Sequence, residues 1–190
     1  MKRIAIRGTR RGFFGFVVGS VAFGLLTGAL LLLPPANAAE ESADLLPVGS
    51  VAPDFAVRAH DGQTVSLSKL KGKQIALYFY PKDDTPGCTK EACELRDSWA
   101  ALQKAGVAVF GVSTQDNGSH KAFAEKFKLP FPLLPDEKGE LAAKYKVPVV
   151  GGKARRVTYL IGKDGKIKHV WPQVNPVGHA ADILAHATAG

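Results

Sequence analysis

The stretch YFYPKDDTPGCTKEAC, residues 78–93, joins a buried strand to a helix and decides the fold of this chain. Residues 75–80 are apolar or aromatic throughout, which is typical of a strand covered on both faces of a sheet. A loop over residues 81–87 follows. Small and apolar side chains then recur at helical spacing, at positions 88, 92, 95, 99 and 102. Ligands in open α/β sheets bind at such strand-to-helix junctions, so the candidate site starts here.

Strand and helix patterns continue to alternate on both sides of this stretch. The turn sequences HDG (60–62) and KDG (163–165) predict two β-hairpins. We expect further strands over residues 55–59, 63–67, 107–112, 157–161 and 166–171, and further helices over 119–127, 137–145 and 180–187. This order predicts an α/β fold, a central sheet with helices on both faces, in one domain over residues 51–190.

The first 38 residues differ from the rest in charge and hydropathy. They hold five of the 25 Lys and Arg residues and none of the 17 Asp and Glu residues. Twin arginines, an uncharged run over residues 13–33 and an Ala-Asn-Ala site predict a twin-arginine-like export signal that is cleaved after Ala38. Residues 39–50 would be a tether, and the domain would work in the periplasm or an equivalent extracytoplasmic compartment. The alternative is an uncleaved membrane anchor over residues 13–33, facing the same compartment.

The rest of the composition excludes several classes of protein. Beyond residue 38, 20 basic residues face 17 acidic ones and are scattered, so we expect no nucleic-acid partner. The five histidines show no metal-ligand spacing, and two cysteines cannot complete a four-thiolate zinc site. We therefore expect no metal and no cofactor.

Cys88 lies where a cysteine can be activated. Thr85 is a candidate helix N-cap and Pro86 a candidate first helical residue, which places Cys88 in the first turn. There the unpaired backbone N–H groups and the helix dipole favour a thiolate, and the same N–H groups can hold a substrate oxygen. A capping Thr85 hydroxyl would compete for these donors. The alternative is that Cys88 is a small buried side chain on the core face of the helix.

The second cysteine, Cys93, is five residues further along the same helix. This spacing corresponds to about 140° of rotation and roughly 8–9 Å between the two Cα atoms. A disulfide needs a Cα–Cα distance of about 4.4–6.8 Å, so the two sulfurs cannot join while the helix is intact. The spacing disfavours a static structural disulfide but allows one that forms and breaks during catalysis.

Residues 78–93 resemble the active-site segment of the atypical two-cysteine peroxiredoxins, and most closely the peroxiredoxin Q or bacterioferritin comigratory protein subgroup. The family pattern P-x-x-x-T-x-x-C is met by Pro81, Thr85 and Cys88, and the second cysteine of the subgroup by Cys93. The similarity extends over about residues 48–186. It implies a thioredoxin-like fold with a mixed sheet, and a thiol-dependent peroxidase that reduces hydrogen peroxide and small alkyl hydroperoxides.

The resemblance also implies a role for each matching residue. Cys88 would be the peroxidatic nucleophile that becomes a sulfenic acid, and Cys93 would resolve it into an intrachain Cys88–Cys93 disulfide. Thr85 would exchange hydrogen bonds with the peroxide, Pro81 would shield the sulfur, and Gly87 would help to bind the substrate.

The active-site arginine of the subgroup matches Arg156. Its guanidinium would stabilise the thiolate and the charge that develops on the leaving oxygen. Arg155 is adjacent and faces the other side of a strand, so a one-residue ambiguity remains in which Arg156 is preferred. Glu91, one turn beyond Cys88, has two interpretations: it supports the active-site residues, or it is an ordinary solvated helix glutamate, and the second is preferred.

Two other functions are compatible with a thioredoxin-like chain. A thiol–disulfide oxidoreductase would need Cys-x-x-Cys, whereas four residues separate these cysteines. A copper-binding module would need a histidine or methionine beside the thiolates, and the one methionine is Met1. For the peroxidase we expect a peroxide substrate, a thioredoxin-like or other dithiol reductant, and a monomeric protein.

Overall fold

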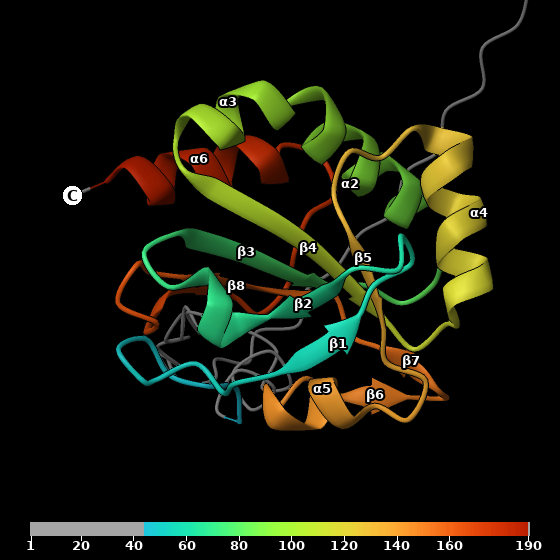
Figure 1. Ribbon diagram of the computed structural model, residues 1–190, viewed down its shortest axis with the longest axis horizontal. Helices are drawn as coiled ribbons and strands as arrows, with labels where there is room; N and C mark the ends of the chain where they lie inside the picture. Colours follow the sequence, from blue (N-terminus) through green and yellow to red (C-terminus); the bar gives the residue numbers. More distant parts are fainter. Residues whose placement is uncertain (1–43, 190) are drawn as a thin grey trace, which may run out of the picture. The chain divides into compact units, whose positions relative to one another are not determined.

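A central β-sheet with helices packed on it forms the core of the protein, as the computed structural model shows for residues 44–189 (Figure 1). The strands are β1 (Ala56–Arg58), β2 (Thr64–Ser66), β3 (Gln74–Phe79), β4 (Val107–Ser113), β5 (Leu133–Pro135), β6 (Val149–Val150), β7 (Lys153–Ala154), β8 (Val157–Ile161) and β9 (Ile167–Trp171). The helices are the 3-10 helix η1 (Leu67–Leu70), α2 (Pro86–Asp97), α3 (Trp99–Lys104), α4 (Asn117–Phe127), α5 (Glu140–Lys144) and α6 (His179–Thr188). The predicted export signal, residues 1–38, and the predicted tether up to residue 43 lie outside the described residues.

The central sheet has five strands in the order β5-β4-β3-β8-β9. Strands β3, β4 and β5 are parallel to one another, whereas β8 runs antiparallel to β3 and β9 antiparallel to β8. Every residue of β3 is buried, as its continuous apolar sequence predicts for a strand at the centre of a sheet. The mixed sheet confirms the predicted fold class.

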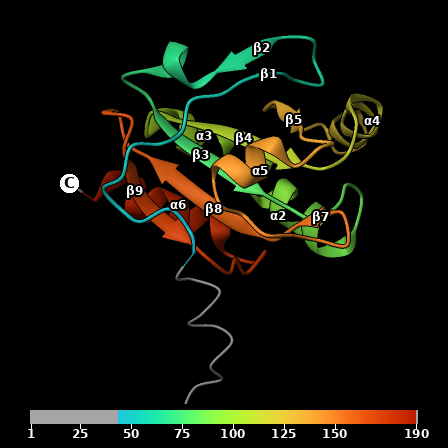
Figure 2. The ribbon, with the colours of Figure 1, turned by 90° about the horizontal axis from the view of Figure 1, so that it is seen from below.

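Alternate residues of β3 contribute to two hydrophobic cores, because successive side chains of a strand point to opposite faces. Leu77 and Phe79 lie in the core that α5 and the β1–β2 hairpin close (Figure 2). Ala76 and Tyr78 lie in the other core, which contains buried residues of α2, α3, α4 and α6. Helices therefore cover both faces of the sheet. Buried residues of α2 lie in the same core as Ala76 and Tyr78 of β3, the strand that leads to Cys88.

Two predicted segments differ from the structure. The apolar stripe over residues 88–102 is divided between two helices, α2 and α3, because the backbone leaves helical geometry at Ser98 (φ −91°, ψ 3°). The proline-rich connection after α4 contains a short strand, β5, which pairs with β4 alone at the edge of the sheet. Pro135 is tolerated there because an edge strand does not need every N–H group for pairing.

The described part of the predicted tether, residues 44–50, packs on the domain. Leu45 is buried in the core closed by α5, and the Gly49 N–H donates to the Ile167 carbonyl at 2.8 Å. The folded domain therefore includes residues before position 51. Within residues 44–189 no helix combines the length and the hydropathy that crossing a membrane requires.

Candidate active site

The junction between β3 and α2 places Cys88 in the first turn of a helix, with only 2% of its surface exposed. Pro86 is the first helical residue and Thr85 the N-cap residue, but the Thr85 side chain does not cap the helix. Its hydroxyl donates instead to the Lys82 carbonyl at 3.0 Å. The N–H groups of the first turn are therefore not taken by Thr85, and they can face a negative charge or a substrate oxygen.

Strand β8 brings Arg156 to Cys88. Because β8 is antiparallel to β3 with Val157 opposite Phe79, the residue before Val157 lies beside the end of β3, where the Cys88 loop begins. The Arg156 Nη2 donates to the Cys88 Sγ at 3.1 Å. Gly87 lies beside this contact, since a Cβ at position 87 would lie 3.4 Å from the same nitrogen, an ordinary van der Waals distance.

Glu91 completes this arrangement, and the expectation that it is solvated is wrong. Its side chain is fully buried, and the other guanidinium nitrogen of Arg156, Nη1, donates to its carboxylate. Residues three apart share a helix face, so Glu91 and Cys88 both face Arg156, and that spacing was the signal in the sequence. The planar guanidinium therefore bridges the thiol and the carboxylate with its two terminal nitrogens.

Burial and charge shift the protonation of the groups around Cys88. Burial raises the pKa of Glu91 to about 7, although the Arg156 charge opposes this shift. Burial disfavours the charged form of Arg156, but Glu91 and Cys88 outweigh it and raise the pKa of the guanidinium. Burial also lowers the pKa of His179 to about 4, so His179 is neutral. Its Nε2 lies 2.9 Å from the Thr158 Oγ1 and 3.9 Å from the Glu91 Oε1.

The remaining predicted residues lie around this centre. Both cysteines are free, with Cys93 half-buried in the same intact helix as Cys88. Pro81 is half-buried at the start of the loop. Arg155 is exposed, and its backbone N–H donates to the Pro148 carbonyl. Of the two adjacent arginines, it is Arg156 that the structure places at the sulfur.

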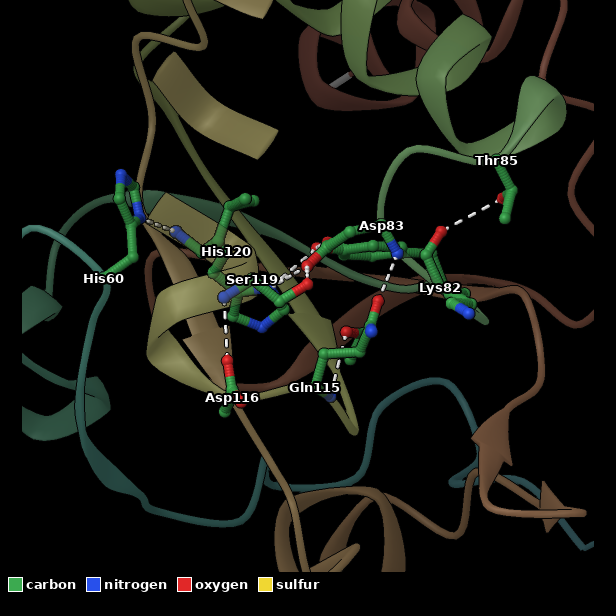
Figure 3. Close-up of polar contacts among 11 residues, drawn as sticks. His60, Lys82, Asp83, Thr85, Gln115, Asp116, Ser119 and His120 are labelled. Carbon is green, nitrogen blue, oxygen red and sulfur yellow. Dashed lines mark hydrogen bonds and ion pairs between the residues drawn. The ribbon is translucent and has the colours of Figure 1, made fainter. Parts of the chain in front are cut away.

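A second polar cluster, which the sequence analysis did not single out, holds the loop before Cys88 (Figure 3). The carboxylate of Asp83 accepts hydrogen bonds from the Tyr80 hydroxyl at 2.6 Å, the Ser119 hydroxyl at 2.6 Å and the His120 Nδ1 at 2.8 Å. Burial acts to raise the pKa of Asp83, but these donors outweigh it and keep the pKa below its usual value. We call these four residues the Asp83 clasp.

Fold and site together define a class, the thiol-dependent peroxidases with a thioredoxin-like fold, and comparison with known proteins supports this class. The chain belongs to the AhpC/TSA family, whose model matches residues 48–170. Within that family it groups with peroxiredoxin Q and the bacterioferritin comigratory proteins. It is 46% identical over 144 residues to a bcp-type peroxiredoxin of Coxiella burnetii, covering 72% of this chain and 95% of the relative. It is 48% identical over 139 residues to the chloroplastic peroxiredoxin Q of Triticum aestivum, covering 72% of this chain and 64% of the relative.

Solved structures agree with these relatives. The peroxidoxin BcpB of Mycobacterium tuberculosis superimposes with a TM-score of 0.70 at 32% identity, over 75% of this chain and 96% of the other. The bacterioferritin comigratory protein of Xanthomonas campestris, whose alkyl peroxide reduction has been studied, superimposes with a TM-score of 0.68 at 30% identity, over 75% and 95%. The protein is therefore a peroxiredoxin, with a peroxide as substrate and a thiol as reductant.

The predicted location is corrected by the same comparisons. We expected an exported protein of the periplasm or an equivalent compartment, or one anchored in the membrane and facing it. The relatives whose names state a location are chloroplast proteins. The twin arginines, the uncharged run and the Ala-Asn-Ala site that suggested export all lie before the region that the family model matches.

Proposed function

We propose that Cys88 is the peroxidatic nucleophile of this peroxiredoxin. The observation that carries this assignment is the hydrogen bond from the Arg156 Nη2 to the buried Cys88 Sγ, at 3.1 Å. A guanidinium in this place stabilises the thiolate, and it can also stabilise the oxygen on which negative charge develops as the O–O bond breaks. The substrates are hydrogen peroxide and small alkyl hydroperoxides.

The reaction proceeds in two steps. The Cys88 thiolate attacks the terminal oxygen of the hydroperoxide, the O–O bond breaks, and Cys88 becomes a sulfenic acid. The leaving alkoxide or hydroxide takes up a proton and departs as alcohol or water. The Cys93 thiolate then attacks the Cys88 sulfur, forming the Cys88–Cys93 disulfide and displacing hydroxide. The hydroxide takes up a proton and leaves as water. A thioredoxin-like dithiol returns both cysteines to thiols.

The neighbours of Cys88 bind and orient the peroxide. The hydroxyl proton of Thr85 is donated to Lys82, so its lone pairs are available to accept the O–H of the peroxide. Gly87 lies beside the Arg156 guanidinium, and Pro81 shields the loop side of the site. Since a single chain supplies both cysteines and Arg156, we propose that the monomer is the working unit.

Two serine variants test the assignment. In Cys88→Ser, peroxide consumption should be abolished. In Cys93→Ser, about one equivalent of peroxide should be consumed per chain, leaving a sulfenic acid that dimedone labels at Cys88. Peroxide consumption by Cys88→Ser at the rate of the unmodified protein would refute the proposal. Dimedone labelling of Cys93 in Cys88→Ser, with no labelling of Cys88 in Cys93→Ser, would reverse the two roles.

A further inference from the structure

The Asp83 clasp joins two parts of the chain that are distant in sequence, the segment after β3 and the start of α4. Tyr80 follows β3, Asp83 lies in the loop before Cys88, and Ser119 and His120 lie in the first turns of α4. The Asp83 side chain is buried, and all three donors point to its two carboxylate oxygens. Hydrogen bonds to a charged acceptor are stronger than those between neutral groups, so this carboxylate is a firm anchor.

The hydrogen bond to Asp83 explains why a histidine occupies position 120 in this cluster. Its ring is fully buried, and among residues 44–189 its Nε2 has no hydrogen-bond partner. An unpaired buried polar atom costs about 1–3 kcal/mol, which an aliphatic side chain would avoid. The other ring nitrogen, Nδ1, contacts the Asp83 carboxylate, which can only accept, so Nδ1 carries the proton.

The peptide group between Lys82 and Asp83 connects the Asp83 clasp to Thr85. The peptide between Lys82 and Asp83 donates its N–H to the Gln115 Oε1 at 2.6 Å. Its carbonyl accepts the Thr85 hydroxyl at 3.0 Å. Because a peptide group is planar, fixing the N–H on one side fixes the direction of the carbonyl on the other. Figure 3 shows the contact from the Asp83 N–H to Gln115 and the contact from Thr85 to the Lys82 carbonyl.

The loop needs such an anchor because it is strained at the next residue. Asp84 has a φ of 52°, in the left-handed region that a residue with a Cβ seldom adopts. Its carboxylate is exposed and pairs with Lys126 at 2.5 Å. Strained backbone persists only where the surrounding contacts hold it, and here those contacts are concentrated at Asp83.

We propose that Asp83 is a positioning residue of the peroxidase site, which orients the Thr85 hydroxyl toward the peroxide through the Lys82–Asp83 peptide group. The inference rests on the proposed role of Thr85 and extends it to residues outside the family pattern. Asp83 itself does not touch the reacting atoms. Its effect should therefore appear in the rate with peroxide and should disappear when Thr85 has no hydroxyl to orient.

The first test compares two adjacent aspartates. Asp83→Asn replaces a group that only accepts hydrogen bonds with one that also donates, so it disrupts the clasp. We expect kcat/KM for hydrogen peroxide to fall about tenfold, within the range that an ångström-scale misplacement can cost. The matched control is Asp84→Asn, which loses the exposed carboxylate while asparagine tolerates the left-handed backbone. Equal values of kcat/KM in the two variants, both folded by circular dichroism at the assay temperature, would overturn the proposal.

A double-mutant cycle then separates positioning from general destabilisation. Thr85→Val removes the hydroxyl while the side chain keeps its shape. If Asp83 acts through Thr85, the double variant should be no slower with peroxide than Thr85→Val alone. Effects of the two substitutions that multiply would overturn the inference and leave the peroxidase assignment intact. An unchanged rate in Thr85→Val would overturn both the inference and the role of Thr85, whereas the role of Cys88 depends only on its own serine variant.

Two substitutions of His120 test whether the hydrogen bond to Asp83 alone restores the rate with peroxide. His120→Asn keeps an N–H donor close to the position of Nδ1, whereas His120→Leu keeps the volume and loses the donor. We expect His120→Leu to lower kcat/KM for hydrogen peroxide and His120→Asn to retain most of it. The reverse order would show that packing around the ring matters and that the hydrogen bond to Asp83 does not.

Discussion

At the scale of single residues, the site depends on the shape of one guanidinium. Arg156 donates to Cys88 through one terminal nitrogen and to Glu91 through the other. A lysine ammonium carries the same charge but cannot bridge two acceptors in one plane. We expect Arg156→Lys to lower kcat/KM for peroxide by about 100-fold or more, as for the loss of a donor to a developing oxyanion. Stopped-flow competition with a haem peroxidase would measure the rate.

The neighbouring arginine is the control for this prediction. Arg155→Lys also replaces a guanidinium with an ammonium, one position earlier, where the side chain is exposed. It should leave the rate with peroxide within about twofold, because the guanidinium that donates to the Cys88 sulfur belongs to Arg156. A larger loss in Arg155→Lys than in Arg156→Lys would mean that the wrong arginine has been assigned.

Glu91 should make the stability of the reduced protein depend on pH in an unusual direction. Its pKa is raised from 4.5 to about 7 in the folded protein. Between these two pH values the folded state binds more protons than the unfolded state, so the free energy of unfolding falls as pH rises. The shift corresponds to roughly 3 kcal/mol. The difference in unfolding free energy, Glu91→Gln minus unmodified protein, should therefore increase by that amount from about pH 4.5 to about pH 7.5.

Urea unfolding of both reduced proteins across this range would measure the difference. His179 has a lowered pKa and acts in the opposite direction, but it is present in both proteins and its contribution cancels in the comparison. A difference that stays constant with pH would show that Glu91 titrates at its ordinary value.

At the scale of elements, the proposed Cys88–Cys93 disulfide requires helix α2 to change its structure during catalysis. Cys88 and Cys93 lie five positions apart in an intact helix, which is too far for a disulfide. One equivalent of hydrogen peroxide should therefore reduce the helical circular dichroism signal at about 222 nm by roughly two turns, the stretch that contains both cysteines. A dithiol should restore it. Cys93→Ser should keep the full signal after the same treatment, because its sulfenic acid has no partner in the helix.

The elements near the site were the part of the fold most accessible from sequence, because each depends on local patterns. The apolar run of β3, the 3.6-residue stripe of α2 and the turn around Asp164 predicted their elements closely. The strand β5 was missed because it has only three residues, Leu133–Pro135, in a connection interrupted by prolines, and it is a strand through its pairing with β4. Glu91 was misjudged because a glutamate in a helix is usually solvated, and its burial follows from the distant Arg156. Asp83 and His120 lie 37 residues apart, and no local pattern links them.

At the scale of the whole molecule, the two cysteines of one chain supply the electrons for a single turnover of the proposed reaction. All the groups proposed to react lie on α2 and at the start of β8. Purified protein without reductant should therefore consume about one equivalent of peroxide per chain and stop, since its thiols are then joined. An added dithiol should restore continuous turnover. Mass spectrometry should show the loss of two hydrogens per chain; sustained turnover without any reductant would contradict the scheme.

The antiparallel pairing of β8 with β3 has a consequence for how this chain can vary. Val157 faces Phe79, and that alignment alone decides which of two consecutive arginines points at the thiol. Sliding the strand by a single residue would exchange every inward and outward side chain, presenting Arg155 to the sulfur and turning Arg156 away. Lengthening the exposed turn at residues 162–166 leaves this alignment untouched, whereas one residue gained or lost between α5 and β8 threatens it. We therefore expect insertions after the five-residue strand β8 to be tolerated much better than insertions before it.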